Sequence, residues 1–211
     1  KWAGKCDDCG EWNTLVEERK EAPSGPGKRV TGRRIVLEAL NLDDRPKPPP
    51  RMQSGISEFD RVSGGGLVQG SATLIGGDPG IGKSTLLLQL TCKLAAAGLK
   101  AAYISGEESA DQVRMRAQRL GLANASVELG TATNASDIAA SMDGPDKPHI
   151  MVVDSIQTMF LPSLDSAPGT VSQVRATAQE LIRAAKNNQV ALLIVGHVTK
   201  DGAIAGPRVL E

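Results

Sequence analysis

The residues with the clearest chemical potential form one glycine-rich loop. Residues 77–85 follow the pattern Gly-x-x-x-x-Gly-Lys-Ser/Thr, the Walker A motif. Glycines let the backbone wrap closely around a phosphate, and successive amide N–H groups then point at it from the start of a helix. The loop consists of Gly77, Asp78, Pro79, Gly80, Ile81, Gly82, Lys83, Ser84 and Thr85.

The last three residues of this loop have separate expected roles. Lys83 would reach the β- and γ-phosphates, the Ser84 hydroxyl would bind Mg²⁺, and Thr85 would lie near the α-phosphate. The alternative is a glycine-rich turn that precedes Lys-Ser by chance. An apolar strand pattern before the loop and a helical pattern after it favour a nucleoside triphosphate site, for ATP with Mg²⁺.

An acidic residue downstream fits the same chemistry. The apolar residues 149–153 end in Asp154, which is the Walker B pattern. Its carboxylate would hold the Mg²⁺ through water. Taken alone, Asp154 could merely end a strand, but its place downstream of a Walker A loop favours the metal.

Hydrolysis also needs a group that orients or deprotonates water. Glu107 and Glu108 follow the strand expected at 100–105. Glu107 comes directly after that strand and is predicted to be the catalytic carboxylate. Glu108 is more simply interpreted as the start of the next helix, where its charge favours the helix dipole.

The two histidines have different expected roles. His197 ends the strand expected at 190–196 and is predicted to contact the γ-phosphate and report its loss to the following loop. A solvated loop histidine is the alternative. His149 stands at a strand entrance and is predicted to be structural.

Strand and helix patterns alternate from residue 52 onward. Strands are predicted at 71–76, 100–105, 127–129, 149–153 and 190–196, and helices at 83–97, 110–120, 135–142 and 171–187. This alternation predicts an α/β fold with a mostly parallel sheet flanked by helices on both faces. The candidate residues then meet at the carboxyl edge of the sheet, where such folds bind ligands.

The part before residue 52 has a different composition. Residues 1–16 are rich in Cys, Trp and Gly, residues 17–51 are charged and proline-rich like a linker, and residues 52–211 carry the strand–helix pattern. Cys6 and Cys9 have the spacing of half a zinc site, with two free thiols as the alternative. Cys92, inside the first predicted helix of that domain, is expected to be a small buried residue.

Overall composition excludes some function classes. The chain has 24 basic and 24 acidic residues, so DNA contact would have to come from a local patch. No apolar run approaches the ~18 residues of a membrane span. The chain's three cysteines, beside a P-loop, fit the reducing cytoplasm better than a disulfide framework.

Several motifs together resemble one family. Residues 54–62 (Ser-Gly-Ile-Ser-Glu-Phe-Asp-Arg-Val) lead through Gly64-Gly65-Gly66-Leu67 into the P-loop, residues 103–109 read Tyr-Ile-Ser-Gly-Glu-Glu-Ser, and residues 196–211 form the most specific stretch. The whole chain resembles bacterial RadA (Sms), a family of RecA-like ATPases of recombinational DNA repair. The resemblance implies a RecA-like motor that forms hexameric rings on single-stranded DNA and promotes branch migration of recombination intermediates, with a RecA-type recombinase as a partner.

The resemblance also implies roles for single residues. Glu107 matches the catalytic glutamate of RecA-like motors, and His197 matches the γ-phosphate sensor position. Cys6 and Cys9 match the second half of a four-cysteine finger that binds Zn²⁺, whose first half would precede Lys1. A Lys-Asn-Arg-Phe-Gly motif and a Lon-like domain would follow Glu211, so the chain is interpreted as a part of a longer protein.

DNA contacts are expected in two loops, at 161–170 and 199–208. The second carries Lys200 and Arg208 among glycines, which suits phosphate contacts without base readout; an exposed loop is the alternative. Two other functions remain open. One is a KaiC-like regulatory ATPase with the same glycine-rich approach to its P-loop, and the other is an ATP- and DNA-binding fragment without turnover.

Overall fold

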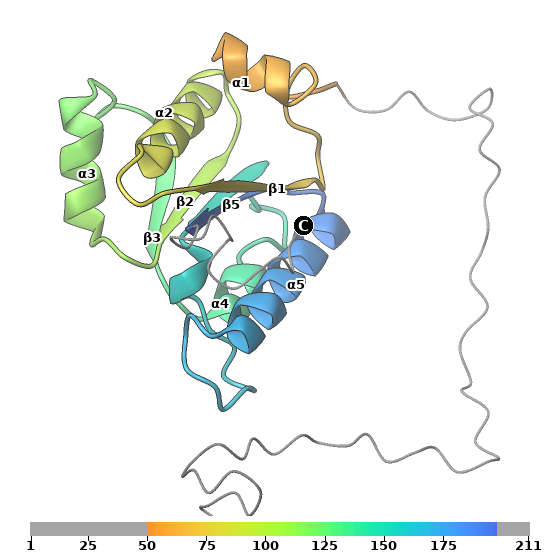
Figure 1. Ribbon diagram of the computed structural model, residues 1–211. Helices are drawn as coiled ribbons and strands as arrows, with labels where there is room; N and C mark the ends of the chain where they lie inside the picture. The colour runs from red at the N-terminus through yellow and green to blue at the C-terminus, as the bar shows by residue number, and fades with distance from the viewer. Residues whose placement is uncertain (1–49, 198–211) are drawn as a thin grey trace, which may run out of the picture. The chain divides into compact units, whose positions relative to one another are not determined.

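The structure is a computed structural model, and it describes residues 50–197 (Figure 1). Five parallel strands form one sheet in the order β1-β5-β4-β2-β3. They are β1 (Ala72–Gly77), β2 (Ala101–Ser105), β3 (Val127–Thr131), β4 (Ile150–Asp154) and β5 (Ala191–His197). All five predicted strands are present, and β3 runs two residues beyond the predicted end.

The four predicted helices are also present. They are α2 (Lys83–Ala96), α3 (Ala110–Arg119), α4 (Ala135–Ala140) and α5 (Val171–Asn188). Two short elements were not predicted. Helix α1 (Ser57–Val62) buries no residue, and the 3₁₀ turn η1 (Ile156–Thr158) is three residues long and closely follows β4. Neither segment therefore shows the periodic apolar pattern from which helices are predicted.

Successive side chains of each strand point to opposite faces of the sheet, and each face packs in its own hydrophobic core. Tyr103, Val152 and Leu193 pack with α2 on one face of the sheet, in a cluster that also takes in Val113 of α3. The side chains of alternate residues, such as Val153 and Ile194, pack with α4 and α5 on the other face. Figure 1 shows α2 and α3 on one side of the sheet and α4 and α5 on the other. The strands β2, β4 and β5 are buried on both faces, which is why they read as continuous apolar runs.

The register of the sheet brings the chemical residues to one edge. Gly77 pairs with His197 at the end of β1 and β5, and Ser105 pairs with Asp154 at the end of β2 and β4. The polar residues that follow these strands therefore start from neighbouring positions.

The segment before β1 is fastened by a carboxylate. Asp60 accepts hydrogen bonds from Ser54 N at 2.9 Å, Ser54 Oγ at 2.8 Å and Gly55 N at 3.2 Å. Gly66 adopts a φ of 120°, and a Cβ there would lie 2.6 Å from the Met52 carbonyl oxygen. The serine, glycine and aspartate positions of this motif therefore have a structural explanation.

We predict that Asp60→Asn destabilises the domain at neutral pH but not in acid. Burial raises the pKa of Asp60, whereas the hydrogen bonds from Ser54 and Gly55 lower it. The hydrogen bonds together outweigh burial, so the pKa of Asp60 lies below the ordinary 3.8. A depressed native pKa gives stability that is complete above the ordinary pKa and is lost as the pH falls through the native pKa. Urea unfolding should show a loss of about 1 kcal/mol at neutral pH that fades in strong acid.

The exposed Asp165 supplies the control for this measurement. Asp165→Asn should change the free energy of unfolding little at either pH. An equal loss for Asp60→Asn at both pH values would contradict the role of its charge.

Candidate nucleotide site

The P-loop backbone has the conformation that an anion site needs. Gly80 and Gly82 have φ values of 80° and 101°, where residues with a Cβ are strained. Helix α2 begins at Lys83 without a side-chain cap, and its first turn holds no acidic residue. Its first amide N–H groups therefore remain available to a phosphate, whose charge the helix dipole favours.

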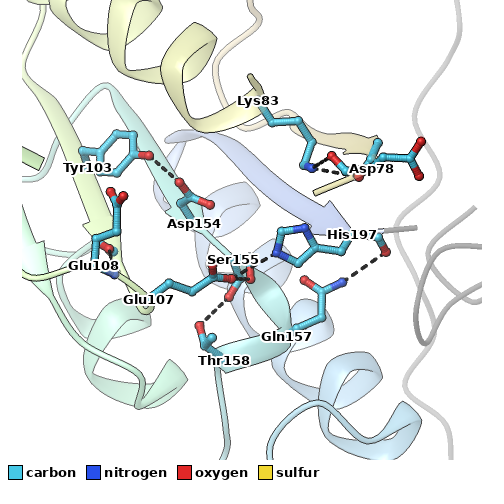
Figure 2. A network of polar contacts seen from close by, with 12 residues as sticks. Asp78, Lys83, Tyr103, Glu107, Glu108, Asp154, Ser155, Gln157, Thr158 and His197 are labelled. Atoms are coloured by element: carbon cyan, nitrogen blue, oxygen red, sulfur yellow. Dashed lines mark hydrogen bonds and ion pairs between the residues drawn. The ribbon is translucent and has the colours of Figure 1, made fainter. Parts of the chain in front are cut away.

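Lys83 lies folded over this loop. Its side chain is buried, and Nζ donates to the carbonyl oxygens of Gly77 at 2.7 Å and Asp78 at 2.8 Å (Figure 2). An ammonium group has three donors, so these two bonds leave one for a phosphate oxygen. The residues of the loop thus fit a nucleotide phosphate.

Asp154 ends β4 with its carboxylate held on one side. Oδ2 accepts a hydrogen bond of 2.5 Å from the Tyr103 hydroxyl, and Oδ1 accepts none from any residue between 50 and 197. Burial and the nearby charge of Asp154 raise the pKa of Tyr103 far above its ordinary value, so the hydroxyl keeps its proton and acts as a donor. A carboxylate with one free oxygen fits a ligand of Mg²⁺ or of its bound water.

Glu107 is paired with two polar side chains, those of Ser155, which follows β4, and of His197, the last residue of β5. Its Oε1 accepts a hydrogen bond from Ser155 Oγ, and His197 Nε2 lies 3.1 Å from the same oxygen (Figure 2). Burial raises the pKa of Glu107, whereas the hydrogen bonds from Ser155 and His197 and the charges of His197 and Lys83 lower it. Together the lowering effects outweigh burial, so the pKa of Glu107 lies below its ordinary value. Glu107 is therefore ionised at neutral pH, as a general base must be, and 44% of its side chain is exposed to solvent.

Glu108 is in a different environment. Its carboxylate forms an ion pair with Arg116 of α3, and its backbone N–H donates to Ser105 Oγ at 2.9 Å. It directly precedes Ser109, the residue that caps α3. This supports the interpretation of Glu108 as part of the helix start, although its charge is paired with Arg116.

Gly106 sets the position of Glu107. Its N–H donates to the Asp154 carbonyl oxygen at 2.8 Å, and a Cβ would lie 2.1 Å from Thr158 Oγ1. Only glycine lets the chain pass this close to η1. No role was predicted from the sequence for Tyr103, Gly106, Ser155 or Thr158; the one available signal was the tyrosine in an aliphatic strand, because a buried hydroxyl needs a partner.

Other predicted residues are placed as follows. Cys92 is buried in α2, and His149 Nδ1 accepts from the Lys100 N–H at 2.9 Å, so both are structural as expected. Cys6, Cys9, Lys200 and Arg208 lie outside the described residues. Between residues 50 and 197 no group of three His, Cys, Asp or Glu side chains could hold a metal ion, and no helix could cross a membrane.

The nucleotide site is an open edge of the sheet. Residues 78–82 are all exposed. Two hollows of about 640 and 620 Å³ lie elsewhere, one between α3 and β3 and one under α1, and no residue of the P-loop lines either of them. A bound nucleotide would therefore remain partly open to solvent in the described part of the chain.

Comparison with known proteins places the chain in a family. The family described as AAA domain matches residues 38–203. The chain belongs to this family. It is also 53% identical over 222 residues to DNA repair protein RadA of Brucella abortus (strain 2308) and 46% identical over 220 residues to that of Bacillus subtilis (strain 168).

These matches cover the whole chain but 47% and 46% of the two relatives, so the chain spans about half the length of the curated relatives it matches. The predicted resemblance to RadA as a RecA-like P-loop ATPase is confirmed.

Two solved structures share the fold. One, described as an ATPase domain, aligns with a TM-score of 0.61 at 15% identity, over 72% of this chain and 65% of that one. A DnaB-like replicative helicase aligns with a TM-score of 0.62 at 13% identity, over 76% of this chain and 47% of that one. The predicted α/β fold, a RecA-like P-loop domain with a parallel sheet between helices, is confirmed.

We predict that Ser155→Ala raises the pKa of Glu107 toward its ordinary value, because the mutation removes a donor to the ionised carboxylate. The pKa can be followed by ¹³C NMR of the labelled glutamate carboxylates over a pH titration, with the resonance assigned by loss in Glu107→Gln. Ser71→Ala, which removes a hydroxyl at the other end of β1, is the matched control and should leave it unchanged. An unchanged Glu107 pKa in Ser155→Ala would contradict the role given to this hydrogen bond.

Proposed function

We propose that this chain carries the ATPase motor of a DNA repair protein, which hydrolyses ATP when it is bound to single-stranded DNA and acts on branched recombination intermediates. One observation carries the proposal: the lysine of the P-loop, the carboxylate of Asp154 and the Glu107–His197 pair converge at the carboxyl ends of β1, β4, β2 and β5. The identity to RadA over the whole chain supports the assignment to DNA repair.

In this proposal, residues 77–85 bind the triphosphate. The uncapped amides of α2 and the third donor of Lys83 contact phosphate oxygens. Ser84 and the free oxygen of Asp154 hold Mg²⁺, directly or through water. When bound, the ion neutralises charge on the β- and γ-phosphates.

Glu107 then orients or deprotonates the attacking water. It is ionised, partly exposed and held by Ser155, so it needs no proton loss before it acts. His197 Nε2 contacts Glu107, and His197 pairs with Gly77 at the start of the P-loop. A γ-phosphate near Gly77 would compete with Glu107 for this imidazole, which supports the role of His197 as a γ-phosphate sensor.

The open site supports a further part of the proposal. RecA-like domains that leave a nucleotide exposed can complete the site with a neighbouring copy, and we propose a homo-oligomer, a hexameric ring. Lys200 and Arg208 would contact DNA phosphates, and Cys6 and Cys9 would bind Zn²⁺ together with a preceding cysteine pair. We propose a cytoplasmic protein with a RecA-type recombinase as a partner.

A second candidate is nucleotide binding without turnover in the chain alone. The exposure of Glu107 and of residues 78–82 favours it, because a catalytic site must exclude bulk water. Measuring ATP hydrolysis by the chain and by the longer protein distinguishes the two candidates: binding without turnover predicts hydrolysis only in the longer protein.

We predict that Glu107→Gln binds ATP as wild type does but hydrolyses it about 10²–10⁴-fold more slowly. Lys83→Ala should instead lose most ATP binding, because it removes the buried ammonium from the loop. Binding of a fluorescent ATP analogue and single-turnover hydrolysis with single-stranded DNA would measure the two effects.

Glu108→Gln is the matched control. It removes the same charge one residue further along, where the carboxylate pairs with Arg116, so hydrolysis should fall far less than in Glu107→Gln. Equal losses in the two variants would contradict the catalytic assignment of Glu107, and no stimulation by single-stranded DNA in the longer protein would contradict the motor.

We predict that Lys200→Ala and Arg208→Ala each weaken binding to single-stranded DNA of any sequence. Each lost phosphate contact should also reduce the slope of log affinity against log salt by about 0.7. Fluorescence anisotropy with a labelled oligonucleotide over a salt series measures both. Lys147→Ala, on the loop before β4, is the control. Unchanged affinity and slope in both variants would remove these residues from the DNA site.

A further inference from the structure

Tyr103 has an unusual position for its residue type. It is fully buried in β2, in a cluster whose other buried members carry no aromatic ring, and it is one of five aromatic residues in the chain. A phenylalanine would fill the same space. The hydroxyl group adds one hydrogen bond in the described part of the chain, the 2.5 Å bond that it donates to Asp154 Oδ2.

The register of the sheet explains how the two residues meet. Tyr103 pairs with Val152 of the adjacent strand, and Asp154 lies two residues beyond Val152, so both side chains point to the face that packs against α2. The tyrosine ring belongs to the same buried cluster as Leu87 and Leu90 of α2. The ring therefore cannot turn away without opening the core, and the hydroxyl is a fixed donor.

The polar groups around this hydroxyl leave the hydrogen bond to Asp154 undisturbed. Glu108 and Arg116 are the other charged groups whose fields act on it, and they are paired with each other. Figure 2 shows the Tyr103 hydroxyl directed to Asp154, with Glu108 below the tyrosine ring. The bond occupies Oδ2, and Oδ1 remains without a partner among residues 50–197.

We propose that Tyr103 is a positioning residue for the metal: its hydroxyl fixes the Asp154 carboxylate so that Oδ1 is directed at Mg²⁺ or at its bound water. This inference rests on the proposed function, in which Asp154 holds the Mg²⁺ of a bound nucleotide. Partners that orient a ligating carboxylate commonly change metal affinity by 10–100-fold when they are removed. Tyr103 itself touches neither the nucleotide nor the metal.

Tyr103→Phe tests the proposal because it keeps the ring and removes only the hydroxyl. The measurement is binding of a fluorescent, slowly hydrolysed ATP analogue, titrated with Mg²⁺ and repeated in EDTA. The Mg²⁺ concentration for half-maximal binding should rise about 10-fold, while the affinity in EDTA stays at the wild-type value. If the hydroxyl served packing alone, its removal would not raise the Mg²⁺ requirement while leaving the affinity in EDTA unchanged.

Thr91→Val is the matched control. Thr91 is also fully buried, and its hydroxyl donates to the Leu87 carbonyl oxygen at 2.6 Å, away from Asp154. Its removal should leave the Mg²⁺ requirement unchanged. Asp154→Asn completes a double-mutant cycle: if Tyr103 acts through Asp154, adding Tyr103→Phe to Asp154→Asn should change the Mg²⁺ requirement no further.

The outcomes separate this inference from the proposed function. If the wild-type chain shows no Mg²⁺-dependent binding of the analogue, the proposed function fails and the role of Tyr103 fails with it. If wild type needs Mg²⁺ and Tyr103→Phe needs no more, or if the two mutations act additively, only the inference is overturned. A loss of folded Tyr103→Phe protein by circular dichroism would also overturn it, because the hydroxyl would then be structural.

Discussion

The parallel register of β1, β5, β4 and β2 is the constraint on which the rest of the site depends. It pairs Gly77 with His197 and Ser105 with Asp154, so the loops after four neighbouring strands start from one edge. A shift of β4 by one residue would turn Asp154 to the face of α4 and α5, because strand side chains alternate. Burial of apolar residues on both faces makes such a shift costly, and in this way the aliphatic core fixes the chemistry at its edge.

The polar side chains at this edge are satisfied mainly by one another. Asp154 takes a hydrogen bond from Tyr103, and Glu107 takes one from Ser155 and contacts His197. Glu108, one residue further, turns to Arg116 of α3. Two adjacent carboxylates thus have different surroundings, which gives one a place near the P-loop and the other a place in the helix start.

The sequence was sufficient where the signal is local. The P-loop, the strand before it and the helix after it follow from residues that are neighbours in the chain. So do the positions of Asp154 at the end of β4 and of Glu107 shortly after β2. Helix α1 was missed because its six residues bury no side chain. The contacts Tyr103–Asp154 and Ser155–Glu107 join residues 51 and 48 positions apart, and no periodicity of a single strand encodes such a pairing. The need for glycine at 106 likewise comes from Thr158, on another element.

A crystal structure of the chain with Mg²⁺ and a slowly hydrolysed ATP analogue tests the central claim most directly. The account predicts the triphosphate inside residues 77–85, the ion between Ser84 and Asp154, and the Glu107 carboxylate directed at the γ-phosphate. A triphosphate bound away from this loop, or a γ-phosphate approached by Glu108 in place of Glu107, would contradict it.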